Sequence, residues 1–267
     1  MGPVQIVLIV AGVACGLAWL LSLITHEHSW VDRLWSVLPV IYLWIFAGSA
    51  GLEDTRLNVM AVLVTLWGAR LTFNFARKGG YSGTEDYRWA ILRTKMKPWQ
   101  FEVFNLVFIV LYQNALLVLI CLPALTASQN PSAFGVGDFV LTILFLGFLL
   151  GETVADQQQW NFHRRKHAPG YTGKGFLTTG LWRYSRHPNF FFEQAQWWVI
   201  YAFGAVAAGS VFHWTIAGAA LLTGLFLGSA AFTEWISQTK YPDYAVYQRT
   251  TSQMIPWVAK RRVPVSG

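Results

Sequence analysis

Long apolar blocks, separated by short polar stretches, make up most of this chain. A helix needs about 20 apolar residues to cross the hydrocarbon core of a bilayer, and seven blocks come close to that length. They span residues 4–25, 33–50, 57–76, 100–122, 135–152, 190–208 and 212–233. The pattern predicts an all-α, polytopic membrane protein with about seven transmembrane helices. A count of six is the alternative, because the second block carries Asp32, Arg33 and Pro39 near its start.

Composition agrees with this class. Hydrophobic residues make up 54% of the 267 residues and charged residues only 12%, about half the charged fraction of a typical soluble domain. The first block lacks the basic start and the cleavage site of a signal peptide, so we expect it to remain as a helix. Cys15 and Cys121 lie in apolar blocks, so we expect them to be packing residues rather than a disulfide or a metal pair. Without repeats or low-complexity linkers, one membrane domain is expected.

The net charge of +7 would suit a nucleic-acid partner, but the placement of the basic residues indicates membrane topology instead. With seven spans, eighteen of the 20 Lys and Arg residues fall in loops and a tail on one side of the membrane. The positive-inside rule then puts the N-terminus outside and the C-terminus in the cytoplasm. Six spans would scatter these charges over both faces. We therefore expect no nucleic-acid partner.

The segment 180–193, GLWRYSRHPNFFFE, places an unusual number of polar side chains directly before an apolar block. Pro188 suits the first turn of a helix, where its missing N–H costs nothing. That helix would present free amides and a positive dipole end beside Arg183 and Arg186, an arrangement that binds phosphate groups. The alternatives are a seam of hydrogen bonds between helices and, for His187, a simple helix cap.

Polar residues recur at helical spacing at the end of this segment, and others precede it. Asn189, Glu193 and Gln196 would share one face of an otherwise apolar helix. Upstream, Asp156 precedes a basic stretch at 164–166, for which contact with anionic lipid headgroups is the alternative. A carboxylate near the membrane boundary is costly unless it has a partner, so Asp156 is harder to explain without a ligand.

Two further clusters are candidates for chemistry. Glu85, Asp86 and Tyr87 follow a glycine-rich loop, and a tyrosine beside an acid can donate a proton to a carbonyl oxygen. Such loops are also often only solvated. Near the C-terminus, Tyr244 and Tyr247 are either aromatic residues of the membrane interface or a wall against an aromatic cofactor.

The Arg-His-Pro-Asn core at 186–189 resembles the signature of the bacterial DUF1295 membrane proteins, relatives of the steroid 5α-reductase and sterol-reductase superfamily. The resemblance extends to WGARL at 67–71, EDYRW at 85–89, Asp156 with its downstream basic residues, and YAVYQRT at 244–250. It covers most of the chain in the expected order. The chain departs from the pattern with three phenylalanines at 190–192, where Tyr-Phe-Gly is common. The Arg-His-Pro core alone also resembles integral-membrane methyltransferases that use S-adenosylmethionine.

The resemblance implies an NADPH-dependent reductase of an activated C=C bond in a lipophilic substrate, such as a 3-oxo-4-ene steroid or a related enone. Residues 1–122 would enclose the lipid, and residues 135–260 would hold the dinucleotide. We expect hydride transfer to the β-carbon of the enone, with Tyr87, assisted by Glu85 or Asp86, polarising the carbonyl oxygen. Carried onto this chain, the implied cofactor contacts are Asp156, Arg164, Tyr184, Arg186, His187, Asn189, Glu193, Tyr244 and Tyr247.

Two other classes stay open. One is a lipid methyltransferase of the isoprenylcysteine or phospholipid type, although S-adenosylmethionine carries no phosphate for the dense set of arginines. The other is a non-catalytic lipid-binding or scaffold protein. We expect a monomer in the bacterial inner membrane, with its cofactor site facing the cytoplasm. Its partners would be membrane lipids and a lipophilic small molecule.

Overall fold

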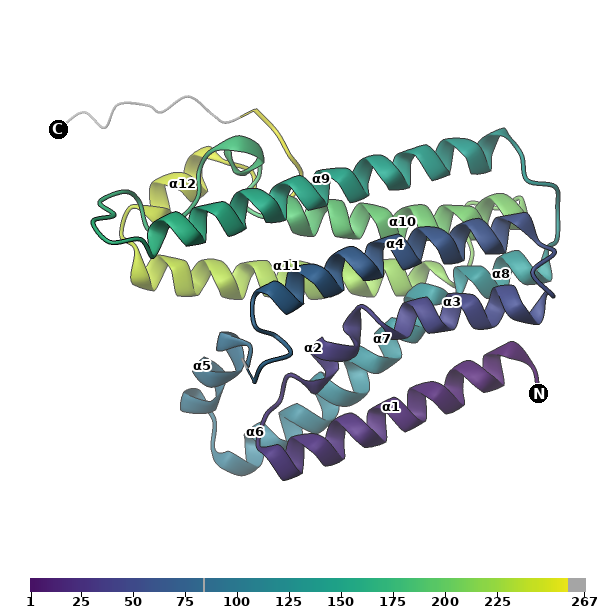
Figure 1. Ribbon diagram of the computed structural model, residues 1–267, viewed down its shortest axis with the longest axis horizontal. Helices are drawn as coiled ribbons and strands as arrows, with labels where there is room; N and C mark the ends of the chain where they lie inside the picture. Colours follow the sequence, from purple (N-terminus) through teal and green to yellow (C-terminus); the bar gives the residue numbers. More distant parts are fainter. Residues whose placement is uncertain (84, 259–267) are drawn as a thin grey trace. The chain divides into compact units, whose positions relative to one another are not determined.

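The computed structural model describes residues 1–83 and 85–258, and apart from one isolated bridge the regular structure in these ranges is helical (Figure 1). A π-helical stretch, η1, and a short 3-10 helix, η2, interrupt the α-helices. In chain order the elements are α1 (Pro3–Thr25), α2 (Trp30–Trp35), α3 (Leu38–Ser49), α4 (Thr55–Arg77), α5 (Tyr87–Lys95), α6 (Pro98–Phe104), η1 (Asn105–Tyr112), α7 (Gln113–Cys121), α8 (Pro123–Gln129), α9 (Val136–Lys166), η2 (Gly180–Arg183), α10 (Pro188–Ala208), α11 (Ile216–Lys240) and α12 (Tyr244–Thr250).

Six helical segments in the described part of the chain are long and apolar enough to cross a membrane. They coincide with six of the seven predicted blocks, which confirms the all-α class and agrees with an integral membrane protein. The remaining block, 190–208, forms α10, which begins at Pro188 as predicted and has 21 residues. This helix is not among the six, which are Pro3–Thr25, Trp30–Ser49, Thr55–Arg77, Pro98–Gln129, Val136–Lys166 and Ile216–Lys240.

The chain divides into two compact units. Unit 1 comprises Met1–Leu144 and Trp197–Leu222, and unit 2 comprises Phe145–Gln196 and Thr223–Gly267. The boundaries fall inside α9, α10 and α11, so each of these helices contributes residues to both units. Residues 197–222 therefore pack with the N-terminal helices, although they come late in the sequence.

Glycines allow two close backbone approaches within unit 1. A Cβ on Gly68 of α4 would lie 2.5 Å from the carbonyl oxygen of Ser36, so a side chain there would force α4 away from the turn before α3. A Cβ on Gly218 of α11 would overlap the carbonyl group of Leu119 on α7. Protein interiors pack at crystal-like density, so such contacts leave little room for adjustment. The second contact explains how the start of α11 joins the N-terminal helices.

A buried ion pair connects the first turns of two helices of unit 1. Arg56 Nε and Nη2 donate to the two carboxylate oxygens of Asp138, at 2.6 and 2.9 Å. The side chains are only 2% and 1% exposed, and Arg56 also donates to Ser132 and to the carbonyl oxygen of Ala133. Because both residues lie near the start of their helices, α4 and α9 begin at the same end of unit 1.

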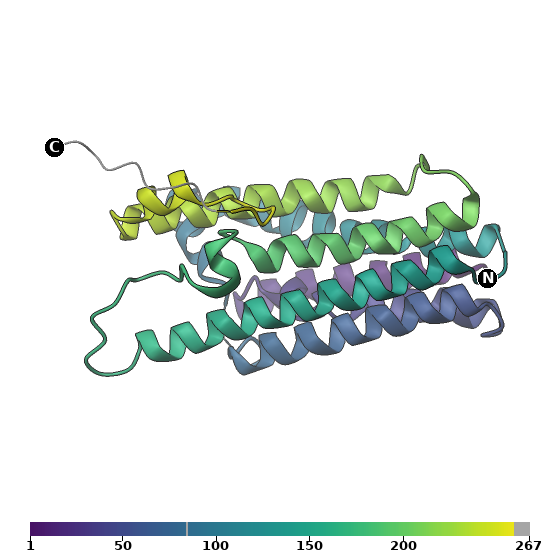
Figure 2. The same ribbon diagram turned by 90° about the horizontal axis from the view of Figure 1, so that it is seen from above.

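In unit 2, α10 lies between α9 and α11 (Figure 2). Gln196 Nε2 of α10 donates to Glu152 Oε2 of α9 at 2.7 Å. On the other side, the rings of Phe190 and Phe226 of α11 are 4.8 Å apart. The predicted motif 180–193 thus lies at one end of a three-helix layer, with its last six residues inside the first turns of α10.

Candidate functional site

Arg186 lies at the centre of a buried polar cluster in unit 2. Its Nε and Nη2 donate to the two carboxylate oxygens of Glu234 at 2.7 and 3.1 Å. The side chains of Arg186 and Glu234 are 10% and 6% exposed. His187 Nε2 lies 3.1 Å from Glu234 Oε1, and Gln248 Nε2 donates to Glu234 Oε2 at 2.7 Å. A bidentate pair of this kind is both strong and geometrically specific.

The same arginine also binds the backbone at the end of α12. Arg186 Nη1 donates to the carbonyl oxygens of Gln248, at 2.8 Å, and of Thr251. The backbone of residues 185–187 runs parallel to the segment that follows α12, with Arg186 N donating to Ser252 O at 2.8 Å and His187 N to Gln253 O at 3.1 Å. The Arg-His-Pro-Asn core therefore fixes the segment that follows α12 through hydrogen bonds from Arg186 and His187.

The two candidate tyrosines of α12 are buried in this cluster. The Tyr247 hydroxyl donates to the carbonyl oxygen of Trp182 and lies 3.4 Å from that of Ser185. Burial raises the pKa of Tyr247 well above its ordinary value, with the neighbouring Tyr244 adding to the effect. Phe176 packs against both rings, with centroids 5.0 Å from Tyr244 and 5.6 Å from Tyr247. Their placement is that of packed residues of unit 2, and a contact with a cofactor stays a prediction.

A seam of buried polar side chains follows the facing surfaces of α9 and α10. On α9, Glu152 and Asp156 are one turn apart and both are buried. On α10, Glu193 and Gln196 are buried at the level where Gln196 bonds Glu152. The oxygens Asn189 Oδ1 and Gln196 Oε1 are buried, and no donor within residues 1–83 or 85–258 reaches either of them. Buried acceptors are normally satisfied, so this seam is the strongest candidate for a ligand site in unit 2.

One of the phenylalanines at 190–192 packs directly against a glycine of the opposite helix, α9. A Cβ on Gly151 of α9 would lie 2.6 Å from the ring of Phe192. The close approach of α9 and α10 therefore relies on glycine at 151, whereas the pattern that the sequence resembles places a glycine at the position of Phe192.

Several of the predicted contacts lie at the exposed end of unit 2. Arg164, in the last turn of α9, and Tyr184, beside Arg183, are exposed. At this end Lys166 Nζ donates to the Tyr241 hydroxyl and to the carbonyl oxygen of Gly175, both at 2.7 Å. Burial opposes ionisation of Tyr241, but the hydrogen bond and charge of Lys166 outweigh it and lower the pKa of this phenol. The end of unit 2 is thus rich in exposed cations.

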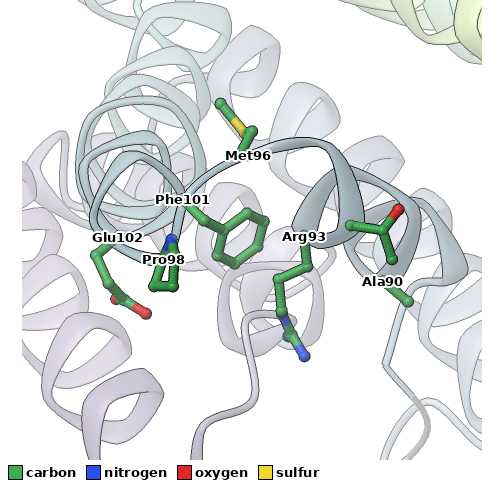
Figure 3. A pocket seen from close by; sticks show the side chains of 7 residues that line it. Ala90, Arg93, Met96, Pro98, Phe101 and Glu102 are labelled. Carbon is green, nitrogen blue, oxygen red and sulfur yellow. The ribbon is translucent and has the colours of Figure 1, made fainter.

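Unit 1 contains the three predicted catalytic residues, next to a pocket between α5 and α6 (Figure 3). The pocket has a volume of about 450 Å³, and Arg93 and Glu102 contribute its charged side chains. Glu85 and Asp86 precede α5, and Tyr87 is its first residue, with the ring half exposed. None of the three lines this pocket.

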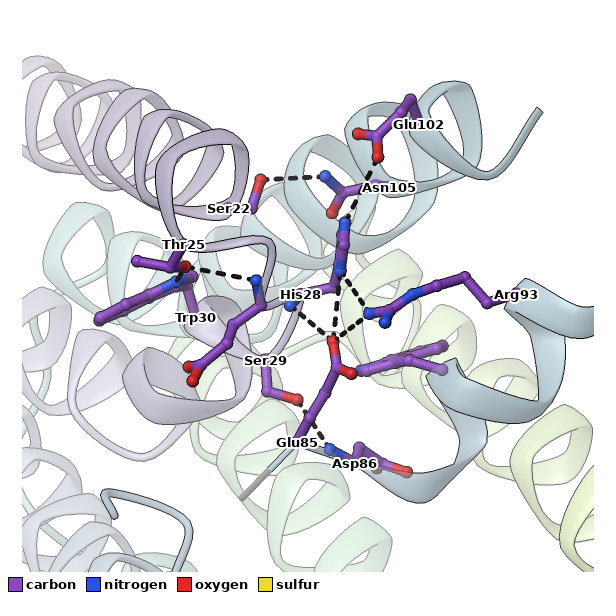
Figure 4. A network of polar contacts seen from close by, with 12 residues as sticks. Ser22, Thr25, His28, Ser29, Trp30, Glu85, Asp86, Arg93, Glu102 and Asn105 are labelled. Atoms are coloured by element: carbon purple, nitrogen blue, oxygen red, sulfur yellow. Dashed lines mark hydrogen bonds and ion pairs between the residues drawn. The ribbon is translucent and has the colours of Figure 1, made fainter. Parts of the chain in front are cut away.

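The carboxylates of the predicted catalytic trio are engaged in a polar network (Figure 4). Glu85 Oε1 accepts from the backbone N–H of His28, at 2.8 Å, and from Arg93 Nη2, at 2.6 Å. Asp86 caps α5 by accepting from the backbone N–H of Arg88, and it also pairs with the guanidinium of Arg88. Burial opposes the charge of Arg88, but Asp86 raises its pKa overall. These bonds stabilise the start of α5, and the assisting role of the acids for Tyr87 stays a prediction.

Two central residues of these clusters were absent from the predicted sites. Glu234 is the only carboxylate in the apolar stretch 197–240, and a lone acid there was the available signal. His28 lies 57 residues from Glu85, and no local pattern distinguishes it. Among the described residues, no group of three or more His, Cys, Asp or Glu side chains is arranged to hold a metal ion.

Comparisons with known proteins place the chain in a family. The chain is 39% identical over 274 residues to an uncharacterized protein of Schizosaccharomyces pombe, and the match covers 95% of this chain and 80% of the relative. The relative comes from a yeast, so it gives no support to the expected bacterial membrane. No solved structure matches the chain. A family profile described as "Protein of unknown function (DUF1295)" matches residues 18–251. The chain therefore belongs to the DUF1295 family.

Proposed function

We propose that this protein is an NADPH-dependent membrane reductase that reduces an activated C=C bond in a lipophilic substrate, such as a 3-oxo-4-ene steroid or a similar enone. The observation that carries the proposal is the buried seam of α9 and α10. Its oxygens Asn189 Oδ1 and Gln196 Oε1 have no donor in the described parts of the chain. Leaving a buried acceptor unsatisfied costs about 1–3 kcal/mol, so a ligand with N–H or O–H groups fits there.

The chemistry of the seam matches the donors of a dinucleotide. A nicotinamide carboxamide offers two N–H donors, and its ribose offers hydroxyl donors. Asn189 and Glu193 are one turn apart on α10 and are suited to orient these groups. Asp156, buried on α9, is a further acceptor. When bound, NADPH supplies the hydride, whereas these side chains orient the ring and exclude water.

The phosphates of the cofactor require cations that are not already paired in a buried cluster. Arg164 and Arg183 are exposed at the end of unit 2, and their guanidinium groups suit phosphate. In this proposal Arg186 and His187 act mainly through Glu234, which they hold at the start of α10. Tyr184 is exposed beside Arg183 and is suited to pack against the adenosine end.

Seven membrane-spanning helices, with α10 as one of them, complete the proposal. A helix of 21 residues is about 31 Å long at 1.5 Å per residue, which equals the hydrocarbon thickness of a bilayer. The N-terminus would lie outside and the C-terminus in the cytoplasm, because the basic residues then face the cytoplasm. The cofactor site would open to the cytoplasm, and the chain would act as a monomer.

Ligand-induced thermal stabilisation tests the cofactor. We expect NADPH to raise the Tm of the purified protein, because a ligand that binds only the native state stabilises it. Asn189→Leu should weaken NADPH binding by about tenfold, since it removes an acceptor that the ligand would satisfy. Asn161→Leu is the matched control, because Asn161 is an exposed asparagine of α9. Equal NADPH affinity in the Asn189→Leu protein would contradict the assignment of the seam.

A methyltransferase that uses S-adenosylmethionine is the second candidate. The observation that favours it is the acidity of the seam, in which Glu152, Asp156 and Glu193 are all buried. Such a surface suits a ligand with a sulfonium and an ammonium group, and Arg186 is paired with Glu234. The same thermal-shift measurement decides: stabilisation by S-adenosylmethionine and not by NADPH would replace the reductase, and no shift with either would favour a non-catalytic protein.

Tyr87 remains our proposed proton donor. We expect Tyr87→Phe to lower the turnover of enone reduction by about a hundredfold, within the usual range for loss of a general acid, while NADPH binding stays unchanged. Tyr81→Phe is a matched control from the same loop, because its hydroxyl donates to the backbone oxygen of Arg33. Undiminished turnover of the Tyr87→Phe enzyme would remove Tyr87 from the mechanism.

A further inference from the structure

The pocket between α5 and α6 has an apolar floor with opposite charges on its two sides. Ala90, Met96, Pro98 and Phe101 supply the apolar lining of this cavity of about 450 Å³. Figure 3 shows the ring of Phe101 between Glu102 on one side and Arg93 on the other. A surface with this arrangement is complementary to a ligand that carries both a negative and a positive group.

Both charges keep capacity for a ligand. Arg93 uses Nη2 for Glu85 and His28, while its Nε and Nη1 donate to no residue in the described ranges. Its side chain is 40% exposed. Glu102 is 50% exposed, and within these ranges its carboxylate has one polar neighbour, His28 Nε2 at 3.7 Å. A guanidinium with two free N–H edges suits a phosphate, and a free carboxylate suits a primary ammonium.

His28 lies between the two charged side chains. Its buried ring lies between them, with Nδ1 at 2.8 Å from Arg93 Nη2 and Nε2 facing Glu102 (Figure 4). Phe101 supports the ring edge-on, with centroids 4.8 Å apart. The guanidinium of Arg93 is therefore fixed by His28 and Glu85 before a ligand arrives, which lowers the entropic cost of binding on its side of the pocket.

The position of the pocket along the chain indicates the source of the ligand. Pro98, part of the lining, is the first residue of the candidate membrane span Pro98–Gln129. Beside it, Trp99 is largely exposed, and tryptophan is enriched at the level of lipid headgroups. The residues at the first turn of a span lie where the hydrocarbon core meets the headgroup region.

We propose that this pocket binds the headgroup of a zwitterionic phospholipid with a primary ammonium, that is, a phosphatidylethanolamine. Arg93 contacts the phosphate and Glu102 accepts from the ammonium, with the acyl chains outside the pocket. Phosphatidylglycerol has no cation for Glu102, and the quaternary ammonium of phosphatidylcholine has no N–H to donate. This site is separate from the proposed cofactor seam and does not depend on the reductase activity.

Native mass spectrometry of the full chain in a neutral detergent tests the proposal. Titration with dilauroyl phosphatidylethanolamine, phosphatidylcholine and phosphatidylglycerol should show the tightest binding for phosphatidylethanolamine. Glu102→Gln should weaken that binding by about tenfold, because a charged hydrogen bond is lost, and should leave phosphatidylglycerol binding equal or stronger. Arg93→Gln should weaken the binding of both lipids.

Two controls make the outcome decisive. Glu53→Gln removes an exposed acid elsewhere in unit 1, and Lys97→Gln removes an exposed cation that does not line the pocket. Neither should change lipid preference. Equal affinity of the wild-type protein for all three lipids would overturn the proposal, as would a Glu102→Gln protein that retains full preference for phosphatidylethanolamine. Because the carboxylate of Glu102 has a single polar neighbour, His28, among the described residues, its substitution is not expected to prevent folding.

Discussion

Replacing Glu234 with alanine is expected to destabilise the protein by about 3–5 kcal/mol, because it leaves the buried guanidinium of Arg186 without its counter-charge. Arg186 and Glu234 are 10% and 6% exposed and form a bidentate pair. The loss also removes the acceptor of His187 and Gln248. For a chain of this size we expect the Tm to fall by roughly 10 °C.

The measurement is thermal unfolding of the purified protein without any cofactor. Asp243→Ala is the matched control, because Asp243 is exposed and its side chain does not cap α12. A double variant, Arg186→Met with Glu234→Met, should recover much of the lost stability, since replacing a buried pair by apolar residues is often neutral. An unchanged Tm for Glu234→Ala would show that Arg186 does not need this partner. In that case Arg186 would again be a candidate for binding the phosphates of NADPH.

Asp138→Ala should be about as damaging, by about 3–5 kcal/mol, for the same reason in unit 1. Arg56 and Asp138 are 2% and 1% exposed. Asp138 Oδ2 also accepts from the backbone N–H of Gly135 at 2.9 Å, so the variant should loosen the segment between α8 and α9. Limited proteolysis in detergent should then produce early cleavage within residues 130–137.

Glu53→Ala is the control for this second variant, since Glu53 is an exposed acid in the segment just before α4. It should show the wild-type cleavage pattern and Tm. Equal stability of Asp138→Ala and the wild-type protein would mean that Arg56 finds another partner or water. The proposed role of the pair in holding the starts of α4 and α9 together would then be wrong.

The helices of this protein could be read from local patterns. Six apolar blocks became candidate spans, because about 20 consecutive apolar residues are stable in a bilayer only as a helix. The start of α10 at Pro188 was also predictable, since proline is favoured in the first turn of a helix. Family membership followed from the motif at 186–189 and its flanking segments.

The candidate site was only partly predictable. Asn189 and Glu193 share a face of α10 because of helical periodicity. Glu193 is buried, and Asn189 is half-buried with its Oδ1 atom buried. The role of Arg186 could not be predicted, because the sequence around it is equally compatible with an exposed phosphate ligand and with a buried partner of Glu234. The acids at 85–86 likewise looked like solvated or catalytic groups until His28, Arg93 and Arg88 were placed beside them.

The sequence by itself determined which segments of the chain are helical and apolar, because those properties depend on neighbouring residues and on the length of each block. Only the tertiary structure decided which polar groups meet. Arg186 and Glu234 are 48 residues apart, His28 and Glu85 are 57 apart, and Arg56 and Asp138 are 82 apart. Burying Arg186 or Arg56 without its carboxylate partner would cost several kcal/mol, so these pairs form where helix packing brings them together. That packing depends on contacts between side chains from distant segments, which hydrophobic periodicity does not encode.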